Sequence, residues 1–348
     1  MTSFRLANDV DDALIRSILR ANGMPGWVEM TMEHEPSFFA ATNRFGREWA
    51  VLAEESGEVV GMYSVALLPV HVNGELEQLG YLGRLRVNPA HRRRIRHLRE
   101  GYESIRPLAP AAGTLPWWFT VVSAQNAAAR RLLESGLRGL PAYHLQGEYT
   151  TFGLPTARGK RQGLWRRARE DDLRRMLDFH HSLSARFQFS PVLSEAGVRS
   201  IGIDRFFICQ RADTLMGVAA LWDQRAFKQI VARRYRRPIG TMVPAYNAYA
   251  KVFRRIPLPR PGQMLEQTFI AFLALADEAL AQGTSLLQDL LSHCDTPVAS
   301  LGLHAAHPLV PELRKLKPMH YAARVYSVSF GERPDLDPRP VQPEAALL

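Results

Sequence analysis

Cysteine is scarce in this sequence: 348 residues contain only Cys209 and Cys294. Two thiols are too few for a disulfide framework or for a zinc site built from cysteines. Long hydrophobic runs are also missing, because the longest, residues 269–276, falls far short of the roughly 20 residues that span a bilayer. The first residues lack the basic start and apolar stretch of a secretion signal. We therefore expect a soluble, cytoplasmic protein with no membrane partner.

What is present is typical of a globular protein. Apolar residues make up 46% of the chain and charged residues 22%, which excludes a wholly disordered or collagen-like chain. At about 150 residues per domain, the length predicts about two domains.

Acidic residues are absent from residues 225–260, although this segment holds ten Lys and Arg side chains. A second basic segment, residues 84–106, holds eight arginines and two glutamates. The net charge is +10, so the rest of the chain must be acidic. Concentrated positive charge is typical of segments that bind phosphate, nucleic acid or an anionic surface. A solvated basic face is the alternative.

Two stretches resemble each other about 160 residues apart. Residues 4–19 and 165–183 each read as a short strand, an acidic turn and an amphipathic helix. Acidic residues favour the first turn of a helix because its amide dipoles are positive there. The repeat predicts two similar halves.

The expected elements follow the same order in both halves. We predict domains over 1–153 and 164–330, a polar linker over 154–163 and a flexible tail over 331–348. The first half is expected to contain a helix at 38–45, strands at 49–53, 59–72 and 75–87, a helix from 94, a strand at 117–122, a helix at 126–135 and a strand at 143–152. The second is expected to contain strands at 206–210, 215–222 and 228–232, an irregular basic stretch to 261, an apolar helix over 265–281, a strand at 298–304, a helix at 311–316 and a strand at 321–330.

The most informative stretch runs from Gly83 to Ile95. A strand ends at Val87, Asn88-Pro89 forms a turn, and a helix then begins inside an arginine cluster. The free amides at a helix N-terminus bind phosphate groups, and arginine adds charge and a forked donor. This pattern predicts an anion site, most simply for a phosphorylated cofactor.

This stretch, together with residues 121–134, resembles the GNAT superfamily of acyltransferases. The family has an Arg/Gln-x-x-Gly-x-Gly/Ala loop that holds the pyrophosphate of acetyl-CoA, and a downstream Asn that helps to bind CoA. The resemblance implies an α/β fold with a mixed sheet, built as two tandem GNAT-like acyl-CoA N-acyltransferase domains. It also implies acetyl-CoA or another acyl-CoA as co-substrate and no metal. The implied binding residues are Leu85, Arg86, Val87, Arg92, Arg93, Arg94, Ile95, Arg96, His97 and Asn126.

The sequence departs from the family pattern at several positions. The loop glycines are replaced by Arg93, Ile95 and His97, and Leu133 stands where the family often has a tyrosine that protonates the leaving thiolate. Glycine lets backbone amides approach a phosphate without a Cβ in the way. The second half has no comparable loop, so we expect it to have a structural role.

The implied reaction is direct attack of an amine on the acyl-CoA thioester. It needs a base for the amine proton and amides that polarise the carbonyl. Candidate catalytic residues are Glu75, Glu77 and Tyr81, which share one face of the predicted strand. The alternative is that these are ordinary exposed strand residues. The acceptor would be a small-molecule or peptide amine.

Two other functions remain open. One is a catalytically inactive GNAT pair that acts as a ligand sensor or binding protein, including a nucleic-acid partner. The other is an aminoacyl-tRNA-dependent transferase of the Fem type, which suits the missing glycines and the acid-free basic segment. His304 and His307 lack a nearby set of further ligands, so no metal site is expected.

Overall fold

The computed structural model describes residues 2–348 except 25, 41–43, 92–94 and 106–113. Twelve strands of the described chain form one mixed sheet, and two more form a separate ribbon. In spatial order the sheet contains β1 (Thr2–Leu6), β3 (Arg47–Glu55), β4 (Glu58–Val72), β5 (Glu75–Val87), β6 (Thr114–Ser123), β14 (Met319–Ser329), β7 (Ala142–Pro155), β13 (Val298–His304), β12 (Gln267–Leu275), β10 (Thr214–Trp222), β9 (Phe206–Arg211) and β8 (Trp165–Arg167). The ribbon pairs β2 (Val28–Glu33) with β11 (Gln229–Tyr235).

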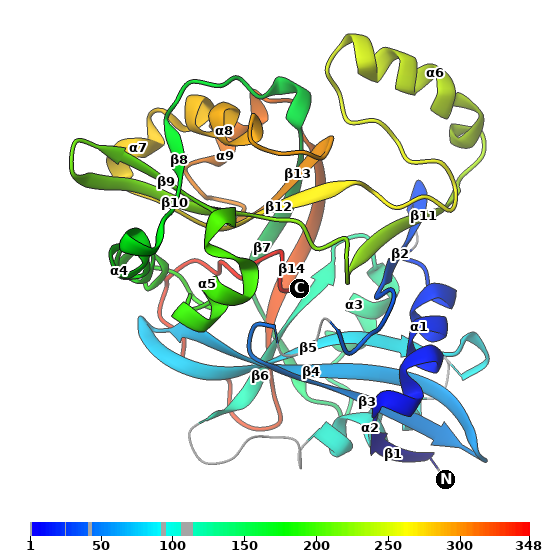
Figure 1. Cartoon of the computed structure of the whole chain (residues 1–348). Coiled ribbons are helices and arrows are strands. Elements are labelled where there is room, and N and C mark those ends of the chain that lie inside the picture. Colours follow the sequence, from blue (N-terminus) through cyan, green and yellow to red (C-terminus); the bar gives the residue numbers. More distant parts are fainter. Residues whose placement is uncertain (1, 25, 41–43, 92–94, 106–113) are drawn as a thin grey trace.

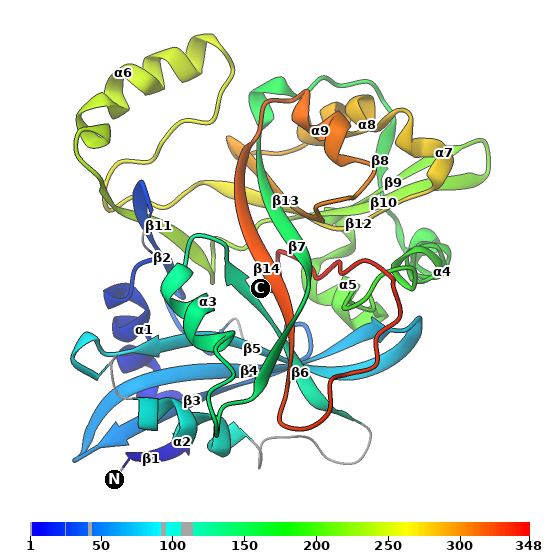
Figure 2. The ribbon, with the colours of Figure 1, turned by 180° about the vertical axis from the view of Figure 1, so that it is seen from behind.

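Helices lie on both sides of this sheet (Figures 1 and 2). The three short helices over residues 277–314 lie together beside the strands of the second half, and the two helices over residues 173–201 lie on the other side of those strands, toward the first half. The helices are α1 (Asp12–Ala21), α2 (Ile95–Ile105), α3 (Ala127–Leu133), α4 (Leu173–Ser184), α5 (Glu195–Ile201), α6 (Ile239–Val252), α7 (Asp277–Leu280), α8 (Gly283–Leu291) and α9 (Val310–Arg314). None of those in the described chain combines the length and hydrophobicity needed to cross a bilayer.

The strand order is the same read from either end of the sheet. β1, β3, β4, β5 and β6 correspond to β8, β9, β10, β12 and β13, and the two remaining strands meet in the middle. β7 comes from the first half of the chain but pairs with β13, whereas β14 comes from the second half but pairs with β6. The division into domains at 153 and 164 stays a prediction. The sheet is continuous and contains strands from both predicted domains.

The repeated openings fold alike. The Arg5 guanidinium donates to both oxygens of Asp11 at 2.7 and 2.8 Å, and Arg166 donates to Asp172 at the same two distances. Each carboxylate also accepts a backbone N–H three residues upstream, from Asn8 or Arg169, at 2.9 Å. The sequence similarity therefore corresponds to one repeated structural unit.

The predicted linker is docked tightly onto the second half. The Asp289 side chain on α8 is fully buried and accepts four backbone N–H groups from residues 162–165 at 2.6–3.2 Å. Thr156 Oγ1 also donates to the Thr296 carbonyl. A buried carboxylate needs such donors to offset its desolvation, so the segment is held in place.

Three predicted segments are wrong in detail. The apolar run predicted as a helix over 265–281 is instead β12, because a strand buried on both faces between β10 and β13 has no polar alternation. Around 38–45 the described residues form turns and bends, with the Phe38 N–H donating to Asp12. β11 confirms the strand predicted at 228–232, but the stretch predicted to be irregular from there to 261 contains α6.

The end of the chain is packed into the core, which corrects the prediction of a flexible tail. Val341, Ala345 and Ala346 are buried in the largest hydrophobic cluster, and the C-terminus lies near the centre of the molecule (Figure 1). Tyr149 donates its hydroxyl to the Pro343 carbonyl, and Gln342 pairs with the backbone of β13. Prolines without periodicity had suggested disorder, but these contacts satisfy the polar groups of the segment.

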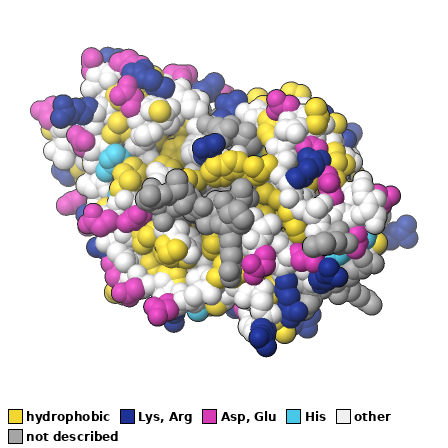
Figure 3. All heavy atoms as spheres, turned by 90° about the horizontal axis from the view of Figure 1, so that it is seen from below, with side chains coloured by type: hydrophobic (Ala, Val, Ile, Leu, Met, Phe, Trp, Pro, Cys, Tyr) yellow, Lys and Arg dark blue, Asp and Glu magenta, His cyan; other side chains and the backbone are white. Residues whose placement is uncertain are grey.

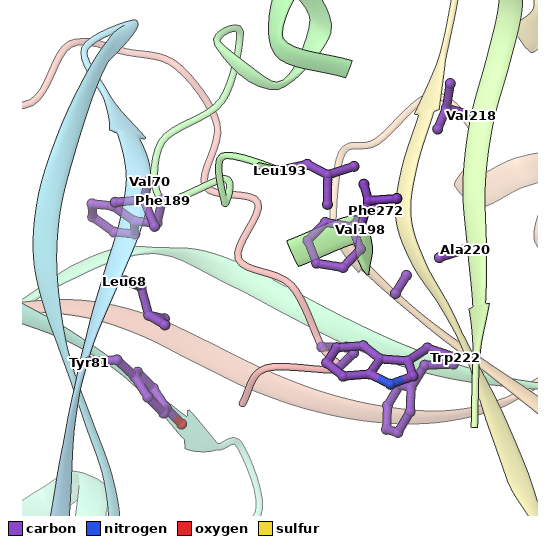
Figure 4. Packing of buried hydrophobic residues seen from close by; sticks show 14 of the residues in the cluster. Leu68, Val70, Tyr81, Phe189, Leu193, Val198, Val218, Ala220, Trp222 and Phe272 are labelled. Carbon is purple, nitrogen blue, oxygen red and sulfur yellow. The ribbon is translucent and has the colours of Figure 1, made fainter. Parts of the chain in front are cut away.

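The largest cluster joins the two halves. Figure 4 shows Leu68 and Tyr81 on β4 and β5 facing Trp222 and Phe272 on β10 and β12, with Phe189 between α4 and α5 among them. Phe189 stacks on Phe119 at a centroid distance of 5.2 Å. The centre of the molecule, where the strands meet, is therefore built from both halves.

Candidate active site

Strands β5 and β6 run side by side only at the start of β5. The parallel ladder pairs Gln78 with Thr114, Gly80 with Trp118 and Tyr81 with Phe119, and ends there. Beyond it, the Thr120 hydroxyl donates to the Leu82 carbonyl at 2.7 Å. Among the described residues the ladder has no further pair for the rest of β5, from Leu82 to Val87, the part that precedes α2 in the chain. We call this opening, between residues 82–87 and 120–123, the first splay.

A β-bulge lies on β5 within the first splay. Met62 on β4 pairs with Arg86 and Ser64 pairs with Gly83, so β5 has one extra residue here. Arg84 has a φ of 51°, a left-handed conformation that is uncommon for a residue with a side chain. A bulge turns backbone groups out of the regular ladder and is common next to active sites.

The second half contains the same arrangement. The parallel ladder of β12 with β13 ends at Phe269 and Ser300, and β12 has one extra residue relative to β10 between Ala271 and Ala274. Phe272 lies in this bulge with a φ of 52°. We call the opening between β12 and β13 the second splay.

The second splay is filled by the chain itself. The Phe272 N–H donates to Glu344 Oε2 at 2.7 Å, and His304 N–H on β13 donates to Gln342 Oε1 at 2.9 Å. Residues 341–346 thus bridge the two separated strands. The bulge amide of the second splay thus has a carboxylate of the same chain as its acceptor.

The predicted anion site lies at the N-terminus of α2, where the first splay ends. Arg92, Arg93 and Arg94 lie outside the described residues, and Ile95 is the first residue of α2. Arg96 is exposed and pairs with Glu100 one turn later. His97 Nε2 lies 3.6 Å from the Glu55 carboxylate, which also pairs with His91.

The other predicted binding residues lie along the splay. Leu85 is exposed, and Arg86 and Val87 are half-buried on the bulged end of β5. Asn126 follows β6 and caps α3, because its Oδ1 accepts the Ala129 N–H at 3.1 Å. The structure therefore brings the described members of this set to the same end of two neighbouring strands.

The predicted catalytic residues are separated. Glu75 and Glu77 pair with Val72 and Val70 beside the hairpin turn, at the start of β5. At about 3.3 Å per residue they lie more than roughly 20 Å from Leu85, too far to serve chemistry there. Tyr81 lies at the mouth of the first splay, and burial raises its pKa to about 12.

A cluster of titratable groups that the sequence analysis missed lies where the halves meet. Lys228 donates to the carbonyl oxygens of Ala346 and Leu348 at 3.2 and 2.6 Å. Desolvation, together with the nearby positive charge of Arg84, lowers its pKa to about 7. Burial raises the pKa of Glu344 to about 7 as well. In the sequence, Lys228 is a single lysine between Phe227 and a predicted strand, and this pattern does not distinguish it from a surface lysine.

His34 belongs to the same cluster. Its side chain is buried, and neither ring nitrogen has a hydrogen-bond partner among the described residues. Burial and the charges of Arg84 and Lys228 lower its pKa to about 2, so the ring is neutral. Arg84 itself pairs with Glu48 and donates to the Ser64 hydroxyl. These contacts place the side chain of the bulge residue beside the cluster.

His304 and His307 do lie close together, with ring centroids 5.2 Å apart. Within the described residues no group of three His, Cys, Asp or Glu side chains could hold a metal ion. Their rings pack instead around Phe187.

No protein-family model and no curated protein match the sequence. Solved structures do match in fold. Saccharomyces cerevisiae N-myristoyltransferase with bound myristoyl-CoA superposes with a TM-score of 0.62 at 11% identity, covering 97% of this chain and 87% of that one. A GCN5-related N-acetyltransferase from Anabaena variabilis superposes with a TM-score of 0.51 at 10% identity, covering 94% and 72%.

These likenesses establish the class of fold. The chain shares the mixed α/β fold of these two acyltransferases, and this confirms the GNAT-like mixed α/β fold that the sequence resemblance implied. At about a tenth of identical residues, the likeness concerns the arrangement of strands and helices alone.

Proposed function

We propose that the protein transfers an acyl group from a CoA thioester to the amine of a small molecule or peptide, at the first splay. The observation that carries this proposal is the contrast between the two bulges. Phe272 donates its amide to the chain's own Glu344, whereas Arg84 has the same bulge geometry in a splay that leads to a basic helix N-terminus.

The reaction needs few groups. The amine nitrogen bonds to the acyl carbon, the C–S bond breaks, and the amine proton and the thiolate charge must both be handled. In this proposal the bulge amides around Arg84 and Leu85 polarise the thioester carbonyl. The pyrophosphate would lie at the N-terminus of α2 with Arg92 and Arg94.

Two described side chains suit the proton steps. Tyr81, with its pKa raised to about 12, stays protonated at neutral pH and can donate to the departing thiolate. Lys228, with its pKa near 7, is neutral in about half of the molecules at pH 7 and can accept the amine proton. Afterwards Lys228 releases the accepted proton to solvent and Tyr81 regains a proton from it.

Ligand-induced thermal stabilisation tests the proposal. Acetyl-CoA, longer acyl-CoA thioesters up to myristoyl-CoA, and bulk tRNA are each added to the full chain. We expect stabilisation by a thioester that Arg92→Ala and Arg94→Ala both reduce, and that the matched surface change Arg314→Ala on α9 leaves intact.

Release of free CoA thiol in the presence of an amine panel completes the test. Thiol release above background supports acyl transfer. Binding of thioesters without thiol release would instead indicate a ligand sensor, and stabilisation by tRNA alone would indicate an aminoacyl-tRNA-dependent enzyme.

A further inference from the structure

Helix α6 stands apart from the sheet. Figures 1 and 2 show it beyond the ribbon of β2 and β11, connected to the sheet by the segments on either side of it. One face of α6 packs on the ribbon through Ile239, Val243 and Tyr246. The Asn247 side chain secures it by bonding to both the N–H and the carbonyl of Leu258.

A second face of α6, roughly a third of a turn from the packed one, is apolar and uncovered. The exposed fractions are 61% for Met242, 45% for Tyr249, 74% for Val252 and 54% for Phe253. Met242, Ala245, Tyr249 and Val252 follow helical spacing and form one stripe, and Phe253 extends it at the C-terminal end of the helix. We call it the outer stripe. Four large apolar side chains exposed together mark an interaction surface rather than scattered exposure.

The charge around the outer stripe is of one sign. No acidic residue occurs between 225 and 260. Arg233 and Arg234 pair with Glu33 and Glu29 on β2. By contrast, in the described chain no ion pair with an acidic side chain forms at the cations that flank α6: Arg236, Arg237, Lys251, Arg254, Arg255 and Arg260. The face at the opposite end of the molecule carries acidic and basic side chains intermingled (Figure 3).

We propose that α6 is an interfacial anchor that lays the outer stripe into the surface of an anionic lipid membrane. A helix that exposes aromatic and aliphatic side chains between two cationic ends can bind at the boundary of headgroups and acyl chains. Lys and Arg side chains there are attracted by the negative surface potential of anionic lipids. The helix lies on the membrane and does not span it.

Other occupants fit less well. A second copy of this chain would bring two acid-free basic arms together, and like charges repel. A nucleic acid would satisfy the arginines and could stack on Tyr249 and Phe253, but it would leave the more exposed Met242 and Val252 without an apolar partner. The sequence alone led us to expect no membrane partner, because no apolar run is long enough to span a bilayer. That criterion does not detect a helix that lies on the membrane surface.

Co-sedimentation of the full chain with lipid vesicles tests the inference. We compare vesicles of phosphatidylcholine alone with vesicles containing about one third phosphatidylglycerol, near 0.1 M salt. We expect binding to the anionic vesicles and a partition coefficient at least about tenfold lower with neutral ones.

Two variants separate the contributions. Met242→Ser/Val252→Ser/Phe253→Ser should lower the partition coefficient on anionic vesicles at least about tenfold. Arg236→Gln/Arg237→Gln/Arg254→Gln should remove the preference for anionic lipid. The control Val10→Ser/Leu76→Ser changes equally exposed apolar residues elsewhere and should bind as the unmodified chain does.

Thermal unfolding of each variant checks that it is folded, and Met242→Ser alone serves where the triple change unfolds the protein. Failure of the unmodified chain to bind anionic vesicles, or unchanged binding by folded outer-stripe variants, would overturn the proposal. The proposal would also be overturned if the chain bound bulk tRNA, if this binding required the arginines but not the outer stripe, and if vesicles did not displace the tRNA.

Discussion

Arg84 in β5 and Phe272 in β12 occupy matching positions in the two halves of the sheet. Each has a positive φ, 51° and 52°, in a strand with one extra residue. Each follows by three residues the last pair of a parallel ladder, Tyr81–Phe119 or Phe269–Ser300. The two positions differ in their surroundings. The end of the chain fills the second splay, where Glu344 contacts the bulge at Phe272.

Filling the first splay should abolish ligand binding without unfolding the protein. Leu85→Trp places a large side chain on an exposed position of the bulged strand, so we expect at least a tenfold weaker affinity for the acyl-CoA thioester. Isothermal calorimetry measures the affinity and urea unfolding the stability. Leu6→Trp, at a similarly exposed position on β1, is the control. Unchanged affinity in Leu85→Trp would place the ligand elsewhere.

Tyr81→Phe should slow the transfer step. Loss of the phenol that protonates the thiolate is expected to lower kcat by roughly 100-fold, with little effect on thioester affinity. Because burial raises the pKa of Tyr81 to about 12, the unmodified enzyme should show no loss of rate from tyrosine ionisation up to about pH 10. A kcat within twofold of the unmodified value would remove Tyr81 from the mechanism.

Lys228 should govern the pH dependence near neutrality. With a pKa of about 7, the neutral amine becomes available as pH rises, so kcat/KM should rise through pH 7. Lys228→Met should lose this rise and at least about 90% of the rate. The control Lys317→Met changes a lysine outside this cluster. Retention of the same pH profile by Lys228→Met would assign the proton acceptor to another group.

Glu344 should make stability fall as pH rises from about 4.5 to 7. Its pKa is raised to about 7 in the folded chain, so the native state binds more protons than the unfolded state across this range. The free energy of unfolding should therefore decrease with pH, relative to Glu344→Gln, by up to about 1.4 kcal/mol per pH unit. Urea unfolding at several pH values measures the difference. In the control Glu278→Gln, which changes an exposed carboxylate, the free energy of unfolding should depend on pH as it does in the unmodified chain. The same pH dependence in Glu344→Gln would contradict the account.

Asp289→Asn should destabilise the protein by about 2–4 kcal/mol, because an amide cannot accept four N–H groups at once. Burial acts to raise the pKa of Asp289, but the four backbone donors outweigh it and the pKa is lowered. Its stabilisation is therefore present above the usual carboxyl pKa and is lost as pH falls below it. Exposed Asp277→Asn should change urea stability by less than about 0.5 kcal/mol. An equally small effect at Asp289 would show that the docked linker does not depend on this carboxylate.

The sequence predicted the parts of the fold that depend on local patterns. Alternation and turn residues marked β4, β5 and the hairpin at Asn73-Gly74, and the repeated acidic turns marked the structural units at Arg5–Asp11 and Arg166–Asp172. The helix predicted over 265–281, where the structure has β12, was wrong. An apolar run buried on both faces has the composition of a buried helix as well as that of a buried strand.

The candidate site was only partly predictable for a related reason. Arg86, Val87 and Asn126 belong to a continuous motif, so their shared location followed from the order of elements. Lys228 and Glu344 meet only because the end of the chain returns to the second splay, a long-range contact that no local pattern encodes. Glu75 and Glu77 lie far from the first splay, because alternation gives the face of a strand but not the distance along it.

Hydrogen exchange of the full chain with and without a saturating acyl-CoA thioester tests the central claim, that one ligand site per chain lies at the first splay. We predict slower exchange in residues 82–91, 95–97 and 120–129, and no change in residues 270–275 and 299–304. Protection confined to the second splay, or no protection at either one, would contradict it.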